Sequence, residues 1–407
     1  MKRVLVIGAG LTGLFAAAMA ARRGAEVTLV TDGRGGLELS HGCIDLLTPP
    51  LSPETFGHLP PAHPYRRAGL ERIREAMDLF REFLTEQGLT YFGSLEHNLA
   101  LPSAAGGIRE TGLAPLAQAT GALADAGTFH LASLAHFRDF SAAFAAQRLR
   151  QRGLPVGGVV ELALPNLPPG RDLYATDLAR LFDDREWREE TIRSWRSPLT
   201  GIQRLGVPAV LGLTGAEAAR TSAEEQLGVR LFEIPTLPPS VPGLRLERAL
   251  RRTAQAAGAH LIEGAHATGL VEAASIGRVT GVVYVSAGGP RPQRAEAVIL
   301  ATGGALHGGL VFRSHGAVQE SVFDLPVEHA SERGGWTAES LFASQPYSRF
   351  GVIIGDDFRP IGPDGQPLFE NLFAAGGLLG GYDRTAEGSR QGIDLVSAYC
   401  AVEGALT

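Results

Sequence analysis

The chain has 407 residues, of which 44% are hydrophobic and 20% charged, so it can form a large core and more than one domain. Its formal net charge is −6, with 37 basic residues against 43 acidic ones, and this balance argues against nucleic acid as a partner. The two cysteines exclude a disulfide framework and are too few to bind an iron–sulfur cluster.

Two features of the sequence bear on location. No run of about 18 uncharged apolar residues occurs, which argues against a membrane-spanning helix. A strand pattern begins at Arg3, without the basic region and small-residue cleavage site of a secretory signal. We therefore expect a cytoplasmic protein that lies at the inner membrane only through a partner protein.

A strand, a turn, a helix and a second strand open the chain. Arg3–Ile7 is an apolar run typical of a strand buried on both faces, and Leu11–Arg23 is an alanine-rich helix pattern. Glu26–Val30 returns as the second strand. This order predicts a βαβ unit in a parallel sheet.

Residues 51–232 follow a different pattern, in which amphipathic or charged helices separated by prolines predominate. The predicted helices are Leu70–Gln87, Phe137–Arg152 and Asp172–Trp195, with proline-marked turns at Pro49-Pro50 and Pro165–Pro169. We therefore expect a helix-rich insertion in this part of the chain.

The β pattern returns after this region. The predicted strands are His260–Glu263, Ala267–Glu272, Val279–Val285 and Ala295–Ala301, with turns at Gly277 and Gly288-Gly289. Glycine becomes frequent again in residues 376–392.

The first turn has the spacing of a phosphate-binding loop. Its residues are Gly8, Ala9, Gly10, Leu11, Thr12 and Gly13. The first glycine permits the tight turn, the second lets a pyrophosphate approach the backbone, and the third lets the helix pack on the strand. The amides at the start of the following helix then face the phosphates. We expect a dinucleotide to bind here.

The end of the second strand departs from the usual fingerprint. An acidic residue normally binds a ribose at this place, but Thr31 occupies it and Asp32 follows. Thr31 can still exchange hydrogen bonds with a ribose. Asp32 is either a ligand that reaches round the turn or a turn residue beside Gly33.

Two later segments also end strands in glycines. The first contains Ala301, Thr302, Gly303 and Gly304 after an apolar run. The second contains Gly376 and Gly377, then Gly380 and Gly381, and continues into a helix-like stretch from Gly392 to Ala405. Both resemble segments of two-dinucleotide-binding flavoproteins, and the second resembles the C-terminal return of the fumarate reductase group.

In the fumarate reductase group the N-terminus of this helix points at the flavin, where its dipole would stabilise the reduced ring. The group's acidic residue corresponds to Gly377 here.

Three segments make the resemblance more specific. Leu37–Leu47 (LELSHGCIDLL), Glu233–Leu246 (EIPTLPPSVPGLRL) and Leu372–Asp383 (LFAAGGLLGGYD) resemble the B subunit of anaerobic glycerol-3-phosphate dehydrogenase. The resemblance extends over nearly the whole chain. It implies a catalytic flavoprotein partner (the A subunit), an iron–sulfur partner that meets the membrane quinone (the C subunit), and a small phosphorylated substrate. The family is described as carrying FMN, whereas the intact glycine turn favours FAD.

The fold expected from these features is an α/β, Rossmann-like FAD/NAD(P)-binding fold with a parallel sheet and a helix-rich inserted cap or substrate domain. We expect residues 1–48, 240–310 and 350–407 to form a discontinuous flavin-binding domain. Residues 49–239 with 311–349 would form the cap.

The candidate catalytic residues are side chains expected near the flavin. Oxidation of a secondary alcohol needs a base that accepts the hydroxyl proton. Arginine side chains are suited to bind the phosphate of a phosphorylated substrate. The candidates are His307, Arg313 and His315 after the second glycine turn, and His41 after the second strand. Each histidine has the alternative of an ordinary hydrogen-bonded loop residue. Ser40, His41 and Gly42 are also expected to cover the flavin.

Other residues have competing interpretations. Arg245 and Arg390 hold either an anion or a surface salt bridge, and Cys43 is either close to the ring or a small buried hydrophobic residue. The segment Pro235–Pro242 either contacts another protein of the complex or stiffens the return from the insertion. No metal site is expected.

Three functions fit these residues. The first is a subunit that oxidises glycerol 3-phosphate in a quinone-linked complex. The second is a flavin-binding member of the same complex that serves electron transfer or assembly. The third is a stand-alone flavin-dependent dehydrogenase or reductase of another small acid.

Overall fold

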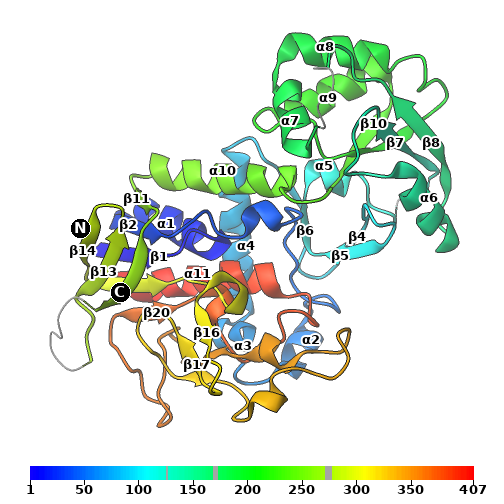
Figure 1. Cartoon of the computed structure of the whole chain (residues 1–407). Helices are drawn as coiled ribbons and strands as arrows, with labels where there is room; N and C mark the ends of the chain where they lie inside the picture. Colours follow the sequence, from blue (N-terminus) through cyan, green and yellow to red (C-terminus); the bar gives the residue numbers. More distant parts are fainter. Residues whose placement is uncertain (125–126, 168–172, 271–276) are drawn as a thin grey trace. The chain divides into compact units, whose positions relative to one another are not determined.

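The structure is a computed structural model that describes residues 1–124, 127–167, 173–270 and 277–407 (Figure 1). The chain forms two compact units. The first unit contains Met1–Gly36, Asp45–Phe83 and Ala249–Thr407, and the second contains Leu37–Ile44 and Leu84–Arg248. Both units are therefore discontinuous in sequence.

The first unit is built on a five-stranded parallel sheet with the strand order β11-β2-β1-β15-β20. These strands are β1 (Arg3–Ile7), β2 (Glu26–Thr31), β11 (His260–Glu263), β15 (Ala297–Leu300) and β20 (Leu372–Ala374). The predicted Rossmann-like α/β fold with a parallel sheet is confirmed, and with it the βαβ unit at the start of the chain and the strand at His260–Glu263. The strand predicted at Ala295–Ala301 is confirmed with narrower bounds.

Two buried helices pack together in this unit. The helix α1 (Leu11–Arg22) and the C-terminal helix α11 (Arg390–Leu406) lie side by side, blue and red in Figure 1. Both are rich in alanine and other small residues, and most of α1 is buried. Small side chains let helix axes approach closely, so this pair carries the glycine turns on a rigid support.

A three-stranded antiparallel sheet follows in the order β12-β13-β14. Its strands are β12 (His266–Leu270), β13 (Gly281–Ser286) and β14 (Gly289–Arg294). The turn predicted at Gly288-Gly289 is confirmed, but β14 was not predicted because it contains Pro290 and Pro292. Proline is tolerated there because β14 is an edge strand. Residues 271 and 272 of the strand predicted at Ala267–Glu272 lie outside the described residues.

The rest of the first unit consists of short elements. They are α2 (Pro53–His58), α3 (Pro64–Ala68), most of α4 (Leu70–Thr85), β16 (Leu310–Phe312), β17 (Val318–Glu320), β18 (Val327–Glu328), β19 (Gly351–Val352), and the 3₁₀ turns η2 (Ala305–His307), η3 (Arg333–Gly335), η4 (Pro346–Arg349) and η5 (Gly376–Leu378). The predicted helix at Leu70–Gln87 is thus confirmed within two residues at its end.

These elements divide the chain differently from the expected boundaries. Residues 311–349 belong to the first unit instead of the insertion, because β16 pairs with β17 and β18 pairs with β19 inside it. Residues 45–83 also belong to the first unit, whereas 37–44 and 240–248 belong to the second. These strands are only two or three residues long, so the sequence pattern did not predict them.

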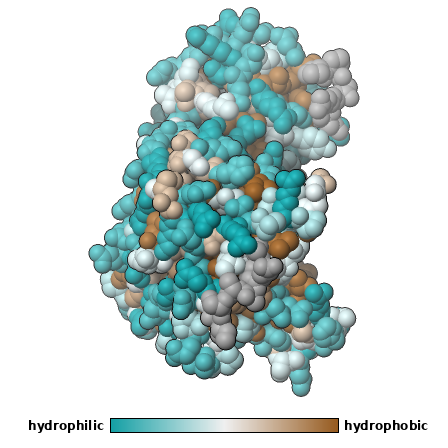
Figure 2. All heavy atoms as spheres, turned by 90° about the vertical axis from the view of Figure 1, so that its left-hand side faces the viewer, coloured by the Kyte–Doolittle hydropathy of each residue, from teal (hydrophilic) through white to brown (hydrophobic). Residues whose placement is uncertain are grey.

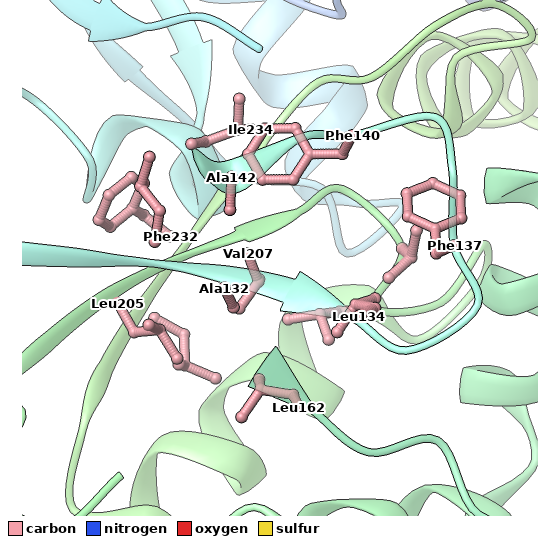
Figure 3. Close-up of a cluster of buried hydrophobic side chains, with 14 of the residues drawn as sticks. Ala132, Leu134, Phe137, Phe140, Ala142, Leu162, Leu205, Val207, Phe232 and Ile234 are labelled. Atoms are coloured by element: carbon pink, nitrogen blue, oxygen red, sulfur yellow. The ribbon is translucent and has the colours of Figure 1, made fainter. Parts of the chain in front are cut away.

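The second unit contains its own parallel sheet, in the order β10-β9-β7-β8. The strands are β7 (Phe129–Leu134), β8 (Val156–Leu162), β9 (Arg204–Pro208) and β10 (Arg230–Ile234), and the helices are α6 (Ala142–Gln151), α7 (Ala175–Asp183), α8 (Arg185–Ser194) and α9 (Ala216–Leu227). Figure 3 shows side chains of the four strands gathered in one apolar core. The inserted region therefore contains a sheet as well as the expected helices, and its strands were missed because short apolar runs are ambiguous between strand and buried helix.

The helices predicted in this region are shorter than expected, and their caps explain why. The helix predicted from Phe137 begins only at Ala142, because Ser141 Oγ accepts a hydrogen bond from Phe144 N. The charged stretch up to Trp195 splits into α7 and α8 at Asp184, whose carboxylate accepts from Trp187 N at 2.9 Å. Asp172 and part of the predicted turn Pro165–Pro169 lie outside the described residues.

Two small antiparallel sheets, two helices and a 3₁₀ turn complete the second unit. One sheet pairs β3 (Tyr91–Gly93) with β6 (Leu113–Pro115), and the other is the hairpin of β4 (Leu99–Pro102) and β5 (Ile108–Thr111), which lies between them in the chain. The helices are α5 (Leu116–Ala119) and the first part of α10 (Val241–Ala256), and the 3₁₀ turn is η1 (Leu37–Leu39). Within the described parts of the chain, no helix has both the length and the apolar character needed to cross a membrane. Figure 2 shows a face on which hydrophilic residues predominate and hydrophobic ones are scattered.

Candidate functional site

Three glycine turns meet at the carboxyl edge of the five-stranded sheet. Because β1, β15 and β20 are parallel neighbours, the residues that follow them share one edge. Ala301 N donates to Ile7 O at 2.9 Å, and Ala375 N donates to Leu300 O at 3.0 Å. Ligands of open α/β sheets bind at this edge, so the fold itself brings the predicted glycines together.

The first turn contains glycines with two different functions. An ideal Cβ on Gly8 would lie 2.3 Å from Ala301 O, and one on Gly13 would lie 1.8 Å from Gly8 O. These two glycines permit close packing of the turn, and Gly8 also has a φ of +109°. Gly10 differs, because a Cβ there would meet nothing within 4 Å. The backbone at Gly10 therefore borders open space.

That open space lies at the start of α1. Gly10 is the N-cap residue, and no side chain caps the helix there. Ala9, Leu11 and Thr12 are buried around the turn. The first amides of α1 and the positive end of its dipole are thus available for an anion, which fits the phosphates of a dinucleotide.

The end of β2 supplies Thr31 and Asp32. Thr31 is buried, and its hydroxyl exchanges hydrogen bonds with the backbone of Gly33. The Asp32 side chain is 78% exposed, and its Oδ2 lies 3.6 Å from Nδ1 of His266. Both residues therefore have local partners, and the predicted contact of either with a ribose stays a prediction.

The second glycine turn, after β15, contains an unsatisfied hydroxyl. Thr302 Oγ1 is buried and has no hydrogen-bond partner among the described residues. The backbone around it is closely packed, since an ideal Cβ on Gly309 would lie 1.8 Å from Gly303 O. A buried hydroxyl without a partner costs free energy unless a ligand satisfies it. Ala301, Thr302 and Gly303 therefore fit a cofactor site.

The third turn follows β20. Gly376 has a φ of +75°, and an ideal Cβ on it would lie 2.3 Å from Thr12 Oγ1. Its amide donates to Ser397 Oγ of α11 at 2.8 Å. The closest atom to an ideal Cβ on Gly377 is Gly304 N, at 3.3 Å. The third turn therefore packs against both the first and the second.

Three other predicted glycines have packing reasons for their identity. An ideal Cβ on Gly380 would lie 3.0 Å from Gly351 O, and one on Gly381 would lie 2.6 Å from Ala62 O. One on Gly392 would lie 2.0 Å from the hydroxyl oxygen of Tyr65 on α3. These contacts account for the glycines, and their predicted contact with a cofactor is not tested.

Asp394 is a residue of this site that the sequence analysis missed. It lies on α11, and its carboxylate accepts hydrogen bonds from the Thr12 side chain and from Gly377 N. The resemblance to the fumarate reductase group implies an acid at the position of Gly377, and Asp394 brings a carboxylate to the same turn from another element. Burial raises its pKa to about 6, against the opposing effect of Arg390. A lone acidic residue in the apolar stretch Ile393–Val402 was the signal available in the sequence.

His307 lies beside the second glycine turn, in η2. An ideal Cβ on Gly36 would lie 2.6 Å from its Nε2, so the ring faces Gly36. Burial and the positive charges of Arg390 and Arg384 lower the pKa of His307. Arg384 is held by Leu379 O, to which it donates at 2.8 Å. The lowered pKa favours the neutral imidazole, which is the form that a general base needs.

Arg313 and His315 lie in the exposed turn between β16 and β17. Arg313 Nε donates to Gln319 Oε1 of the same hairpin at 2.9 Å. This partner gives Arg313 a structural function, and the catalytic function predicted for the two residues is not tested. Arg390 is the exposed first residue of α11.

Ser40, His41 and Gly42 belong to the second unit, whereas the glycine turns belong to the first. His41 Nδ1 accepts from Cys43 N at 3.0 Å, and Ser40 Oγ accepts from Gly42 N at the same distance. Cys43 is fully buried and donates its thiol to Gln118 Oε1, which supports its interpretation as a small buried residue.

Arg245 is a buried residue of α10. Its guanidinium binds the buried carboxylate of Glu233 on β10, and its Nε donates to Gly212 O at 2.7 Å. The expected surface salt bridge is therefore wrong in position, because the pair is buried. It ties α10 to the sheet of the second unit.

The matching family model and the two sequence relatives agree with this geometry. The model of a family described as FAD binding domain matches residues 3–393, which include all three glycine turns. The chain is 32% identical to the probable B subunit of anaerobic glycerol-3-phosphate dehydrogenase from Halobacterium salinarum, covering 98% of this chain and 96% of that one. It is 30% identical to the B subunit of the same dehydrogenase from Pectobacterium atrosepticum, covering 98% and 97%. A solved 3-ketosteroid-Δ4-(5α)-dehydrogenase from Rhodococcus jostii RHA1 aligns with 100% of this chain and 97% of its own at 14% identity and a TM-score of 0.39.

Proposed function

Because the chain belongs to the FAD-binding family that forms the B subunit of anaerobic glycerol-3-phosphate dehydrogenase, we propose that it oxidises sn-glycerol 3-phosphate to dihydroxyacetone phosphate within a quinone-linked complex. The observation that carries this proposal is the carboxyl edge of the five-stranded sheet. There Gly10 borders open space at an uncapped helix start, and the buried hydroxyl of Thr302 has no partner among the described residues.

Different residues of this edge would contact different parts of FAD. Gly8–Gly13 and the first turn of α1 would hold the diphosphate, and Thr302 would donate a hydrogen bond to the cofactor. Asp394, held by Thr12 and Gly377, would accept one from a cofactor hydroxyl. The first glycine turn is intact and suits a diphosphate, which FAD contains and FMN does not, so it favours FAD over FMN. When bound, the flavin supplies an acceptor for a hydride.

The proton of the substrate hydroxyl needs a base in the protein. His307 is our candidate, because its lowered pKa keeps the imidazole neutral beside the second glycine turn. Arg384 and Arg390 add positive charge near this ring, which favours a phosphorylated substrate. His41 is the alternative base, and Arg313 and His315 are less favoured because they lie in an exposed hairpin turn.

The electrons leave through another protein in this proposal. The sequence has two cysteines, both buried, so it cannot supply the thiolates of an iron–sulfur cluster. We infer two partners, an iron–sulfur protein that reaches the membrane quinone (the C subunit) and a sister flavoprotein (the A subunit). Membrane contact would be made through these partners.

The direct test is anaerobic reduction of the bound flavin. The flavin of the purified chain is released and identified by mass, and a second sample is mixed with sn-glycerol 3-phosphate without oxygen. We expect FAD, and we expect its oxidised absorbance to be bleached by the substrate but not by glycerol. If reduction requires the sister flavoprotein, the chain is instead the electron-transfer member of the complex.

A further inference from the structure

The second unit contains a cavity of about 220 Å³, which is a separate feature from the glycine turns. Three segments line it. They are the loop Leu39–His41, the β4–β5 hairpin through Leu101–Ser103 and Arg109, and the proline-rich segment through Pro235, Thr236, Pro238 and Ser240. Gln118 of α5 completes the lining. The two most distinctive motifs of the sequence therefore face one cavity.

The polar groups of this cavity are predominantly hydrogen-bond donors. Arg109 supplies a permanent positive charge. Ser103 Oγ accepts from Gly107 N at 3.0 Å, so its own hydroxyl hydrogen remains to be donated. His41 accepts through Nδ1, so a proton on its ring lies on Nε2. No acidic side chain is among the described residues that line the cavity.

Thr236 is an independent indication that a ligand belongs here. Its Oγ1 is buried and has no hydrogen-bond partner among the described residues. A hydroxyl in this state destabilises the protein unless something satisfies it, and Thr236 lines the cavity.

The start of α10 adds to the positive character of the cavity. Ser240 immediately precedes Val241, the first residue of this 16-residue helix, and Leu244 N donates to Ser240 O at 2.9 Å. The positive end of the helix dipole therefore lies beside Ser240. Leu39, Leu101 and the prolines supply apolar surface for a short carbon skeleton.

We propose that this cavity binds a small polyol phosphate, with Arg109, Thr236 and Ser103 as the ligands of its phosphate group. The identification of the polyol as glycerol 3-phosphate rests on the proposed function, whereas the preference for a phosphate monoester rests on the cavity. Phosphate oxygens satisfy the donors, and the apolar wall covers the carbon atoms. The segment Pro235–Ser240 then forms a stiff wall of a binding site.

The test measures binding to the flavin-loaded full chain by calorimetry. The probes are sn-glycerol 3-phosphate, inorganic phosphate and glycerol. We expect the affinity order glycerol 3-phosphate, then phosphate, with no detectable binding of glycerol. Arg109→Gln should weaken both phosphate probes by roughly tenfold to a hundredfold, because it removes a charge-assisted hydrogen bond. Arg196→Gln removes an exposed arginine of the same unit and should bind as the wild type does.

A second variant gives a signature that a merely structural residue would not show. Thr236→Val keeps the shape of the side chain and removes the unsatisfied hydroxyl. It should raise the thermal midpoint of the unliganded protein while weakening phosphate binding several-fold. If Arg109→Gln fails to fold, this variant alone decides the question. Wild-type affinity in Thr236→Val, or no binding of either phosphate probe to the wild type, would overturn the proposal.

The same proteins separate this proposal from the proposed function. Loss of phosphate binding in Arg109→Gln, with no bleaching of the wild-type flavin by glycerol 3-phosphate, would support the cavity and refute the dehydrogenase. Bleaching of the wild-type flavin together with wild-type phosphate binding in Arg109→Gln would refute the cavity and leave the dehydrogenase. Bleaching of the wild-type flavin together with weakened phosphate binding in Arg109→Gln would support both.

Discussion

Gly10 and Gly13 lie three residues apart in the same turn, yet a methyl group at each would meet different surroundings. At Gly13 it would overlap Gly8 O, whereas at Gly10 it would enter open space. The φ of Gly10, −75°, also suits any residue. The structure thus separates the glycine that shapes the turn from the glycine that leaves room for the phosphates.

Gly10→Val should therefore give folded, colourless protein. The valine side chain would occupy the phosphate space, while stability should fall by only about 1 kcal/mol through the poorer N-cap. Flavin content per chain and thermal unfolding are the measurements. Gly13→Ala is the contrast, because its overlap should cost on the order of 1–3 kcal/mol or more and lower the yield of folded protein. Full flavin occupancy in Gly10→Val would refute this placement of the phosphates.

Asp394 predicts a pH dependence of the flavin-free protein. Its pKa is raised from the ordinary value of 3.8 to about 6, so the folded state binds this proton more tightly than the unfolded state. The contribution to stability is therefore complete below about pH 4 and is lost as the pH rises through 6. The full loss is at most about 3 kcal/mol.

Asp394→Asn should remove this part of the pH dependence. The flavin-free variant should gain stability relative to wild type as the pH rises from 4 to 7, measured by urea unfolding. Flavin binding should weaken in the same variant, since a carboxylate acceptor is lost. Asp78→Asn changes an exposed carboxylate on α4 and serves as the control. Parallel stability profiles of Asp394→Asn and wild type would contradict the assignment.

At the scale of elements, the buried pair of Glu233 and Arg245 joins β10 to α10. The carboxylate also accepts from Leu211 N at 3.0 Å, and the guanidinium also donates to Gly212 O. Three segments of the second unit thus depend on one ion pair. Removal of one partner leaves a buried charge without compensation, which costs far more than the pair contributes in total.

Arg245→Met should therefore destabilise the second unit by about 3–5 kcal/mol. Urea unfolding followed by tryptophan fluorescence is suitable, because the buried Trp195 lies in this unit. Arg185→Met removes the exposed partner of Glu189 on α8 and should leave the stability nearly unchanged, because water screens an exposed ion pair. Equal effects of the two substitutions would show that burial does not determine the cost.

At the scale of the whole molecule, the proposed function depends on how electrons leave the flavin. Flavin accepts two electrons as a hydride, whereas transfer over distance proceeds through metal centres one electron at a time. Cys43 and Cys400 are both buried, and neither forms a disulfide. Burial also raises the pKa of the Cys400 thiol to about 12, which keeps it protonated and a poor metal ligand.

The isolated chain should therefore transfer electrons poorly from glycerol 3-phosphate to quinone. The comparison is glycerol-3-phosphate:quinone reductase activity of the chain alone and of the complex reconstituted with the sister flavoprotein and the iron–sulfur protein. A small soluble dye as acceptor controls for loss of substrate oxidation. Comparable quinone turnover in the two preparations would refute the need for partners and favour a stand-alone enzyme.

The sequence alone determined the local features of this protein. These features are the βαβ unit at the N-terminus, the glycine turns after β1, β15 and β20, and the helix α4. Each depends on hydrophobic periodicity and turn residues that lie close together in the sequence. The glycine spacing also predicted the cofactor class, because a backbone cradle for phosphates requires particular residues at fixed offsets.

The tertiary structure decided everything that depends on contacts between distant residues. It showed a second parallel sheet in the region expected to be helix-rich, and it brought Asp394 to Gly377 from α11. It also assigned Ser40–Gly42 to the second unit, where Ser40 and His41 line the same cavity as Arg109 and Thr236. Strand pairing and side-chain convergence join positions tens to hundreds of residues apart, and local sequence patterns contain no signal for such contacts.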